Sequence, residues 1–429
     1  MVAYLLLGET DVGRRRRERE RVILAHLPSV DHTFSKTLPD IPESRMALSR
    51  LARSINGFEP VGGNRAALMA DSNASIDHIA ADMDAATDHI HLSFYIWLTD
   101  NNGTKIVEAL KRAAGRGVKC RALVDRLGSS ALIKSPQWRH MQEAGIETGV
   151  ALGLGSLLVP ASLGRVDLRN HRKSVIIDNR VCYFGSQNCA DPEFRVKPKY
   201  APWVDIFIRV EGPIARQSQY LFACDWMLAC DDDLSSYLTQ PIPTNEGGAA
   251  LQAFGTGPTI RASAMSEMFA AAIFSANRQV TITTPYFVPD EALVSALCSG
   301  ARRGVDVTVI FPQRNDSFEV AAASRSYYAD LLTAGVNVHE YCHGLLHAKT
   351  ITVDDDLVLI GSANMDRRSL ELNYENNVLC YDPELAQAVR VRQQEFLAHA
   401  VPVTLEQVAA WSLPRRLWNN VMVMLGPVL

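Results

Sequence analysis

Short apolar runs alternate with amphipathic stretches in both halves of the chain. In the first half, an apolar run at residues 90–95 precedes a helical pattern that ends at the Arg-Gly-Val of residues 116–118, and a second run covers residues 120–125. In the second half, runs at residues 280–284 and 307–311 flank a similar pattern. Strands that alternate with helices in this way predict an α/β sheet in each half.

The chain also repeats a longer motif. Residues 171–188 read HRKSVIIDNRVCYFGSQN, and residues 347–364 read HAKTITVDDDLVLIGSAN. The matching positions share one offset of 176 residues without a gap, and they are His171/His347, Lys173/Lys349, Asp178/Asp354, Gly185/Gly361, Ser186/Ser362 and Asn188/Asn364. Self-similarity over this distance predicts two copies of one domain-sized unit rather than a solenoid.

Each copy of the motif predicts a β-hairpin with an aspartate at its turn. In the first copy, residues 175–177 and 181–184 are the expected strands, and Asp178 begins the turn. Side chains two positions apart in an extended segment lie on the same face. We therefore expect the His and Lys of each copy to share a face, and Asp178 and Asp354 to be structural and to point away from it.

The residue types of the motif favour phosphate chemistry. An imidazole, an ammonium, a hydroxyl and an amide together can bind a phosphate. Two copies packed about a pseudo-two-fold axis would bring two histidines to one pocket, where one attacks phosphorus while the other protonates the departing alkoxide and then deprotonates the incoming alcohol. The groups expected to stabilise charge on the phosphate oxygens are Lys173, Lys349, Asn188 and Asn364, and those expected to bind substrate through a hydroxyl are Ser186 and Ser362.

The composition of the chain limits the classes of partner and compartment that fit it. The 429 residues include 43 Lys and Arg against 47 Asp and Glu, a formal net charge of −4. Nucleic-acid-binding proteins are usually basic, so we predict no nucleic-acid partner. The eight cysteines form no Cys-x-x-Cys pair, which favours reduced thiols in a cytosol-like compartment. No apolar stretch reaches the ~18 residues of a membrane-spanning helix.

Three apolar segments are candidates for contact with lipid. Residues 1–8 precede an arginine cluster at residues 14–17, as at the cytoplasmic exit of a membrane helix. Residues 421–425 follow two arginines and suit a membrane interface. The first half carries an apolar insertion at residues 150–160, which could line acyl chains or enter a bilayer. The alternatives are a frayed helix for the first segment and packing on the protein body for the other two.

One segment matches the sequence of a metal-binding motif but not the structure that the motif requires. His339-Glu-Tyr-Cys-His343 matches the zinc-protease pattern, but that chemistry needs both histidines on one face of a helix, and residues 336–341 alternate like a strand. We therefore predict no metal site. The chain contains neither a P-loop nor a G-x-S-x-G motif, so nucleotide hydrolysis and a serine-hydrolase triad have no support.

The duplicated motif resembles that of the phospholipase D superfamily, whose members carry two H-x-K-x4-D motifs and need no metal. Further segments, spread over nearly the whole chain, resemble the bacterial cardiolipin synthases: PWVD (202–205), EGP (211–213), TTPYFVPD (283–290), GLLHAK (344–349), MDRRSL (365–370), LNYE (372–375) and GPVL (426–429). This resemblance implies two pseudo-two-fold-related phospholipase D-like α/β domains in one chain, with the active site at their interface and no cofactor.

The resemblance also implies an activity. In that family, one phosphatidylglycerol donates its phosphatidyl group to an active-site histidine and releases glycerol, and a second phosphatidylglycerol takes up the group to form cardiolipin. His171 is then the expected nucleophile and His347 the general acid/base, although pseudo-symmetry leaves open which of them attacks. Relatives pair each histidine with a carboxylate of the other half, which matches Glu375 with His171 and Asp205 with His347. Such a carboxylate fixes the imidazole tautomer, and an ordinary salt bridge is the alternative.

The predicted organisation has five parts: a membrane-proximal basic segment at 1–45, a first phospholipase D-like domain at 46–240, a polar linker at 241–258, a second domain at 259–400 and a C-terminal interfacial segment at 401–429.

The resemblance implies phospholipid substrates, contact with a membrane surface, and a place at the bacterial cytoplasmic membrane with the catalytic body on the cytoplasmic side. Family members usually begin with one or two membrane-spanning helices ahead of the equivalent of residues 1–8, so the mode of attachment stays open.

Two other functions stay open. The same fold could hydrolyse phosphodiesters, as a phospholipase D or a nuclease, and the net charge and the apolar insertion argue only against nucleic acid as its substrate. A non-catalytic lipid-binding scaffold is an alternative of another class, and two intact motifs argue against it. The acceptor alcohol, the ratio of transfer to hydrolysis and the oligomeric state also stay open.

Overall fold

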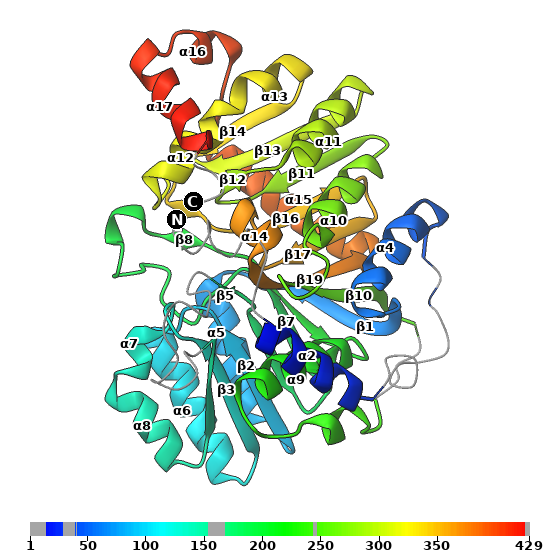
Figure 1. Ribbon diagram of the computed structural model, residues 1–429, viewed down its shortest axis with the longest axis vertical. Helices are drawn as coiled ribbons and strands as arrows, with labels where there is room; N and C mark the ends of the chain where they lie inside the picture. Colours follow the sequence, from blue (N-terminus) through cyan, green and yellow to red (C-terminus); the bar gives the residue numbers. More distant parts are fainter. Residues whose placement is uncertain (1–13, 29–38, 40, 153–167, 243–246, 425–429) are drawn as a thin grey trace.

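The protein folds into two α/β halves that share one β-sheet. The computed structural model describes residues 14–28, 39, 41–152, 168–242 and 247–424. One half lies above the other in Figure 1, and strands β1 and β10 lie side by side where the halves meet. The predicted α/β class is confirmed.

The strand order repeats about the junction between the halves. Within the described ranges the order along the sheet is β20-β14-β13-β11-β16-β17-β19-β10-β1-β9-β7-β6-β2-β3-β4. Counted outward from the antiparallel pair β1 and β10, the first half reads β1, β9, β7, β6, β2, β3, β4, and the second reads β10, β19, β17, β16, β11, β13, β14. The same connectivity on both sides confirms the duplication, and β20 extends one edge.

The first half begins at β1. Its strands are β1 (Val61–Leu68), β2 (His89–Phe94), β3 (Lys119–Asp125), β4 (Glu147–Ala151), β5 (Arg169–Asn170), β6 (Ser174–Ile177), β7 (Val181–Gly185), β8 (Trp203–Val204) and β9 (Phe207–Glu211). Its helices are α5 (Ser72–Asp84), α6 (Asn101–Gly115), α7 (Ser130–Ile133), α8 (Pro136–Glu143), η3 (Pro198–Tyr200), α9 (Ala215–Ala229) and η4 (Ser235–Leu238).

The second half begins at β10. Its strands are β10 (Ala249–Thr256), β11 (Gln279–Thr283), β12 (Phe287–Val288), β13 (Asp306–Pro312), β14 (Asn337–Tyr341), β15 (Leu345–Leu346), β16 (Thr350–Val353), β17 (Leu357–Gly361), β18 (Met365–Asp366), β19 (Asn373–Tyr381) and β20 (Ala400–Pro402). Its helices are α10 (Ala264–Phe274), α11 (Glu291–Arg302), α12 (Phe318–Ser326), α13 (Tyr328–Ala334), α14 (Arg367–Glu371) and α15 (Pro383–Ala398).

Local sequence explains why equivalent helices begin where they do. Asp100 precedes α6 and accepts a hydrogen bond from the Gly103 N–H at 3.0 Å, while Asp290 precedes α11 and accepts one from the Leu293 N–H at 2.9 Å. Each aspartate satisfies an amide that the first turn of a helix leaves unpaired. The strands and helices predicted from apolar periodicity in each half are present, as β2, α6 and β3 and as β11, α11 and β13.

The core is divided between the halves and their junction. One cluster packs α5 and α6 on the first half of the sheet, and another packs α10, α11 and α13 on the second. A third joins the central strands of both halves to α9 and α15, as through Trp226 and Val389. This shared core fixes one half against the other.

The predicted domain bounds need two corrections. Residues 249–256, expected within a linker, form the buried strand β10, whose small residues and glycine hide its strand character in the sequence. Helix α4 (Met46–Asn56), expected in the first domain, packs Leu48 and Ala52 against the core of the second half. It is preceded by the short helix η1 (Glu43–Arg45).

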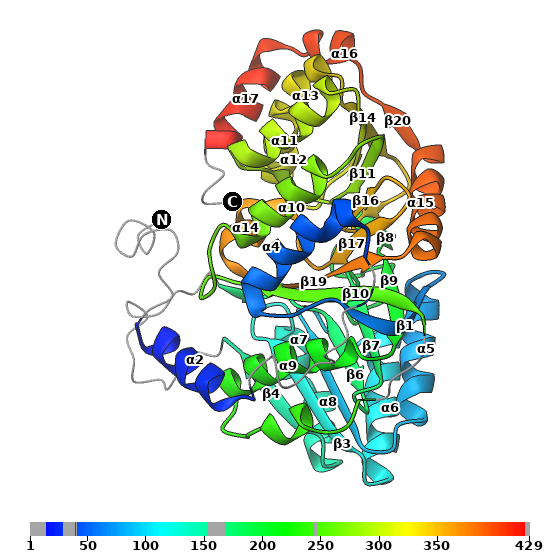
Figure 2. The ribbon, with the colours of Figure 1, turned by 90° about the vertical axis from the view of Figure 1, so that its right-hand side faces the viewer.

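The terminal segments pack on the body through part of their length. Helix α2 (Arg14–His26) contains the arginine cluster and lies against α9 (Figure 2), and Arg19 pairs at 2.9 Å with Asp231, which follows α9. Helices α16 (Leu405–Ala409) and α17 (Leu413–Met424) follow β20, and α17 packs on α12. Within the described ranges, no helix combines the length and apolar character needed to cross a membrane. Residues 1–8 and most of the apolar insertion lie outside these ranges.

Candidate active site

Two short crossed strand pairs bring the motif histidines to the junction of the halves. Strand β5, just before His171, pairs with the start of β19 in the second half, and the His171 N–H donates to the Tyr374 carbonyl at 2.9 Å. Strand β15, just before His347, pairs with β8 in the first half, and the His347 N–H donates to the Val204 carbonyl at 2.8 Å. Each histidine is thus fixed beside a strand of the opposite half.

A carboxylate within that opposite strand, or directly after it, holds each imidazole. His171 Nδ1 lies 2.9 Å from both carboxylate oxygens of Glu375, and His347 Nδ1 lies 2.6 Å from Asp205 Oδ1. The pairing expected from the family resemblance is therefore present. Because each Nδ1 hydrogen faces a carboxylate, Nε2 carries the lone pair in the neutral ring.

The electrostatics of the site favour neutral imidazoles beside ionised carboxylates. Burial lowers the pKa of His171 to about 4 and also lowers the pKa of His347. Burial would raise the pKa of Glu375 and of Asp205, but the facing histidines and lysines outweigh it and hold both pKa values at about 2. At neutral pH both rings therefore have a free Nε2 lone pair before substrate binds.

The two motif serines hold these carboxylates. Ser186 Oγ donates to Asp205 at 2.6 Å, and Ser362 Oγ donates to Glu375. Both serines are fully buried, and neither lines the cavity described below. The prediction that their hydroxyls contact substrate is corrected, because the turn after each motif strand directs the hydroxyl to the carboxylate of its own half.

The motif lysines lie directly behind the histidines. Lys173 Nζ donates to the His171 carbonyl at 2.7 Å, and Lys349 Nζ donates to the His347 carbonyl at 2.6 Å. Burial lowers the pKa of Lys173 to about 7 and that of Lys349 to about 8. An anionic phosphate in the adjoining cavity would favour the charged form of both.

The histidines and the motif asparagines line one cavity of about 470 Å³. Asn188 accepts from the Ile96 N–H at 3.1 Å through its oxygen, which leaves the amide nitrogen for the cavity. The oxygen of Asn364 is buried and has no hydrogen-bond partner. A larger hollow of about 930 Å³ between α2 and α9 contains none of the motif residues.

Sequence reasoning did not identify several groups that line this cavity. They are Tyr95, Arg169, Phe194, Lys197, Trp203, Tyr286, Asp316, Asp366 and Arg368. Tyr95 meets the His171 ring edge-on at 4.9 Å, and Trp203 lies 4.7 Å from the His347 ring. One of them carried a sequence signal, because Arg169 lies two residues before His171 and so shares its face in an extended segment.

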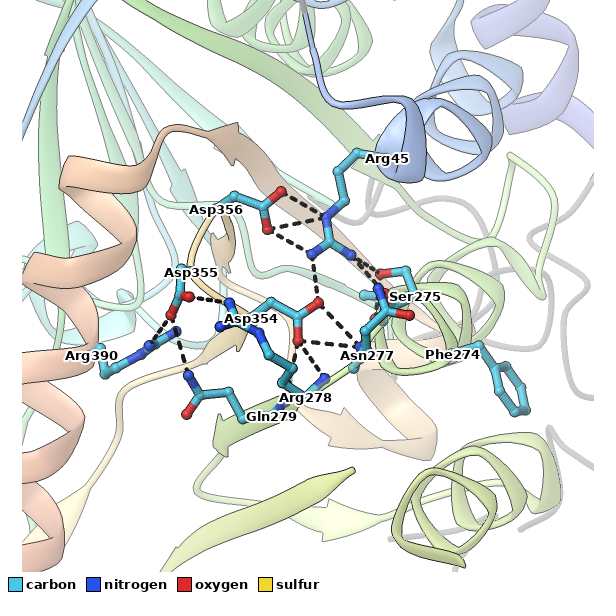
Figure 3. A network of polar contacts seen from close by, with 12 residues as sticks. Arg45, Phe274, Ser275, Asn277, Arg278, Gln279, Asp354, Asp355, Asp356 and Arg390 are labelled. Carbon is cyan, nitrogen blue, oxygen red and sulfur yellow. Dashed lines mark hydrogen bonds and ion pairs between the residues drawn. The ribbon is translucent and has the colours of Figure 1, made fainter. Parts of the chain in front are cut away.

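The motif aspartates lie away from the cavity and hold the hairpin turns, as expected. Asp178 accepts hydrogen bonds from the backbone of residues 87–89 at 2.9 Å. Asp354 accepts from the backbone of residues 277–279 and pairs with the buried Arg45 at 2.9 Å (Figure 3). Each aspartate ties its turn to the start of the neighbouring strand.

The described residues offer no cluster of three or more His, Cys, Asp or Glu arranged to hold a metal ion. The segment that matches the zinc-protease motif, residues 339–343, begins within β14, in agreement with the predicted strand. Its residues therefore lack the helical spacing that a zinc site of this type needs.

A crossed pair of duplicated histidine motifs around one cavity defines a two-domain phospholipase D-like protein. Residues 79–201 and 269–397 match the family model described as "Cardiolipin synthase, PLD-like domain". The chain belongs to this cardiolipin synthase family of phospholipase D-like proteins.

Similar proteins span the whole chain. Cardiolipin synthase A of Erwinia tasmaniensis is 34% identical over 100% of this chain and 90% of its own length, and that of Proteus mirabilis is 35% identical with the same coverage. The solved phosphatidylserine synthase of Haemophilus influenzae superposes with a TM-score of 0.66 over 89% of this chain and 100% of its own, at 14% identity. That likeness concerns the fold alone.

Proposed function

We propose that this protein is a cardiolipin synthase that moves a phosphatidyl group from one phosphatidylglycerol to another through a phosphohistidine. The observation that carries the proposal is the pair of carboxylate-held histidines, His171 and His347, that face one cavity. Membership in the cardiolipin synthase family, over nearly the full length of its relatives, supports the transferase over other phosphodiester chemistry.

In the first step, His171 Nε2 attacks the phosphorus of the donor lipid. The anionic phosphodiester of the donor favours the charged form of His347, so this histidine takes up a proton on Nε2 when the donor binds. A P–N bond then forms and the bond from phosphorus to the glycerol oxygen breaks, while His347 gives this Nε2 proton to the leaving oxygen. Glu375 stabilises the positive charge that develops on His171, and Asp205 stabilises protonated His347. The choice of His171 as nucleophile follows the family resemblance.

In the second step, His347 acts as the base. It takes the proton from a hydroxyl of the second phosphatidylglycerol, whose oxygen attacks phosphorus as the P–N bond breaks. Cardiolipin leaves and His171 returns to its neutral form. Lys173, Lys349, Asn188 and Asn364 are the proposed groups that stabilise charge on the phosphate oxygens in both steps.

Transfer and hydrolysis share the first step and differ in the second. If water reaches the phosphohistidine, phosphatidic acid replaces cardiolipin as the product. The two phosphodiesters exchanged in the transfer are chemically alike, so this reaction needs no nucleotide. We expect no nucleic-acid substrate, because the chain has a formal net charge of −4.

The direct test is incubation of the purified protein with phosphatidylglycerol in detergent micelles, followed by separation of the lipid products. We expect cardiolipin and free glycerol in equal amounts. His171→Ala and His347→Ala should each abolish turnover. Phosphatidic acid as the main product would replace this proposal by the hydrolytic one, and near-wild-type activity of either variant would contradict the two-histidine mechanism.

We place the reaction at the bacterial cytoplasmic membrane, with the catalytic body on the cytoplasmic side. The support is an apolar surface beside the cavity. Val320 of α12 lines the cavity, and the exposed Phe318 of the same helix meets Trp418 of α17 with ring centroids 5.7 Å apart. Residues 413–424 are therefore the proposed interfacial part of the C-terminal segment.

A further inference from the structure

The two sides of the cavity have equivalent backbones, but the side chains at equivalent positions differ in polarity. In the crossed pair next to His171, Arg169 of β5 stands opposite Asn373 of β19. At the equivalent positions next to His347, Leu345 of β15 stands opposite Trp203 of β8. A polar, cationic pair on one side thus replaces an apolar pair on the other.

A second arginine joins the polar side. Arg368 of α14 lines the same cavity as Arg169. Helix α14 leads directly into β19, where the Leu372 N–H donates to the Arg368 carbonyl at 2.8 Å, and the start of β19 pairs with β5, which contains Arg169. Both arginines therefore lie on the His171 side of the cavity.

Binding of the transferred phosphate does not explain why the cavity has these two arginines. Lys173 and Lys349 lie behind the two histidines, and they are the groups proposed above to supply positive charge to that phosphate. On the His347 side, the cation that lines the cavity is Lys197, which pairs with Asp316 at 2.7 Å. The His171 side has two cations, Arg169 and Arg368, and Arg169 also donates to the Leu168 carbonyl at 2.6 Å.

The proposed reaction brings a second anion into the cavity. The acceptor, phosphatidylglycerol, carries its own phosphodiester, three carbons away from the hydroxyl that attacks. A guanidinium group matches a phosphate with two parallel hydrogen bonds, which a point charge such as lysine does not provide. A hydrolase with water as acceptor would have no use for such a site.

We propose that Arg169 and Arg368 form a second phosphate site, which binds the phosphodiester of the acceptor lipid and makes the enzyme prefer an anionic lipid alcohol over glycerol or water. This inference rests on the proposed function and deepens it, because it gives the acceptor its own binding residues. The two lysines serve the phosphate that is transferred, and the two arginines serve the one that is not.

The test compares two acceptors at the same phosphohistidine. Free radiolabelled glycerol attacks phosphorus, the P–N bond breaks, and labelled phosphatidylglycerol forms. This exchange requires both histidines but involves no second phosphate. Cardiolipin formation requires the same histidines and an acceptor with a phosphate. Both rates are measured in one mixture of phosphatidylglycerol micelles and labelled glycerol.

We expect Arg169→Gln and Arg368→Gln each to lower the ratio of cardiolipin formation to glycerol exchange about tenfold, the loss typical of one charge-assisted contact. Arg368→Lys should give an intermediate ratio, because it keeps the charge and loses the paired hydrogen bonds. Arg367→Gln is the matched control. It lies on the same helix, pairs with Glu371 and does not line the cavity, so it should keep the wild-type ratio.

Three results would overturn the inference. An unchanged ratio in both glutamine variants would mean that the arginines do not bind the acceptor. Loss of both reactions in parallel would mean that they serve the transferred phosphate or the fold. An equal fall in Arg367→Gln would mean that the effect is not specific to the cavity. Failure of the proposed function is distinct, because wild-type protein would then catalyse neither reaction.

Discussion

The two sides of the active site share one set of hydrogen bonds and differ in the side chains around it. On each side, a motif histidine is hydrogen-bonded to a carboxylate of the other half, and a motif serine holds that carboxylate. The surroundings differ, because Glu375 contacts His171 through both oxygens and also accepts from Asn373, whereas Asp205 contacts His347 through one oxygen beside the Trp203 ring.

This contrast separates the residues that both chemical steps require from the residues that distinguish the donor from the acceptor. Two displacements at one phosphorus need two imidazoles in matched positions, and a duplicated backbone supplies them with the same hydrogen bonds. The donor and the acceptor are not related by that symmetry, because one loses glycerol and the other keeps its phosphate. The side chains that line the cavity are therefore where we expect the halves to differ.

The largest effects should come from removing the charge of each carboxylate. We expect Glu375→Gln and Asp205→Asn each to lower the rate of cardiolipin formation about 10²- to 10⁴-fold, because an amide no longer stabilises the imidazolium or fixes its tautomer. Rates of cardiolipin formation, measured with equal amounts of folded protein, check this expectation.

The same variants also distinguish the two histidines. A phosphodiester substrate with a nitrophenol leaving group needs no proton for its departure. With this substrate, Asp205→Asn should still release a burst of nitrophenol, whereas Glu375→Gln should not, because its nucleophile is impaired. The opposite pattern would exchange the roles of His171 and His347.

A smaller difference should separate the two hairpin aspartates. Both tie a turn to the neighbouring strand through three backbone amides, but Asp354 also pairs with Arg45, which is 2% exposed. We expect Asp354→Ala to lower the free energy of unfolding by about 3 kcal/mol and Asp178→Ala by about 2 kcal/mol, as measured by urea denaturation. Equal losses would mean that the contact with Arg45 adds nothing.

The sign of the pH dependence follows from the same contacts. Burial raises the pKa of both aspartates, but the backbone amides, together with Arg45 for Asp354, outweigh it and hold both pKa values below the usual 3.8. The stability that each contributes is therefore present above pH 3.8 and is lost as the pH falls through the lower, folded-state pKa. The deficit of each alanine variant should be constant near neutral pH and shrink below about pH 4.

The sequence could predict the parts that depend on pattern and repetition. A period of two predicted one face for His171 and Lys173, and a constant offset paired them with His347 and Lys349. The serines could not be placed in this way, because a hydroxyl after a turn can face either substrate or a neighbouring carboxylate. The direction that Ser186 and Ser362 take depends on where the turn after β8 and strand β19 bring their carboxylates, and that is tertiary information.

The role of Arg368 and the position of α4 show the same limit. Arg368 lies in a segment quoted for its family resemblance, but only the packed structure brings it into one cavity with Arg169. Helix α4 precedes the first half in sequence and packs on the second, because the apolar residues it buries meet α10 and not the nearer strand β1. Contacts between segments far apart in sequence leave no local pattern.

The smallest effect should come from the exposed face of α17. Leu413, Leu417, Val421 and Met424 recur at helical spacing and are all exposed, while Met422 on the opposite face is buried against α12. Leu417→Asp combined with Val421→Asp should lower the fraction of protein that sediments with phosphatidylglycerol vesicles about tenfold, since two partly buried apolar side chains would be lost from the interface.

Val391→Asp is the matched control for this last prediction. Val391 is as exposed as Val421, at 44% against 46%, but it belongs to α15, which lies on the opposite side of the molecule from α17 in Figure 2. If the protein binds membranes through the α17 face, the control should sediment like the wild type. Equal detachment of both variants would mean that added negative charge weakens binding wherever it lies, and the contrast between the C-terminal segment and the rest of the surface would disappear.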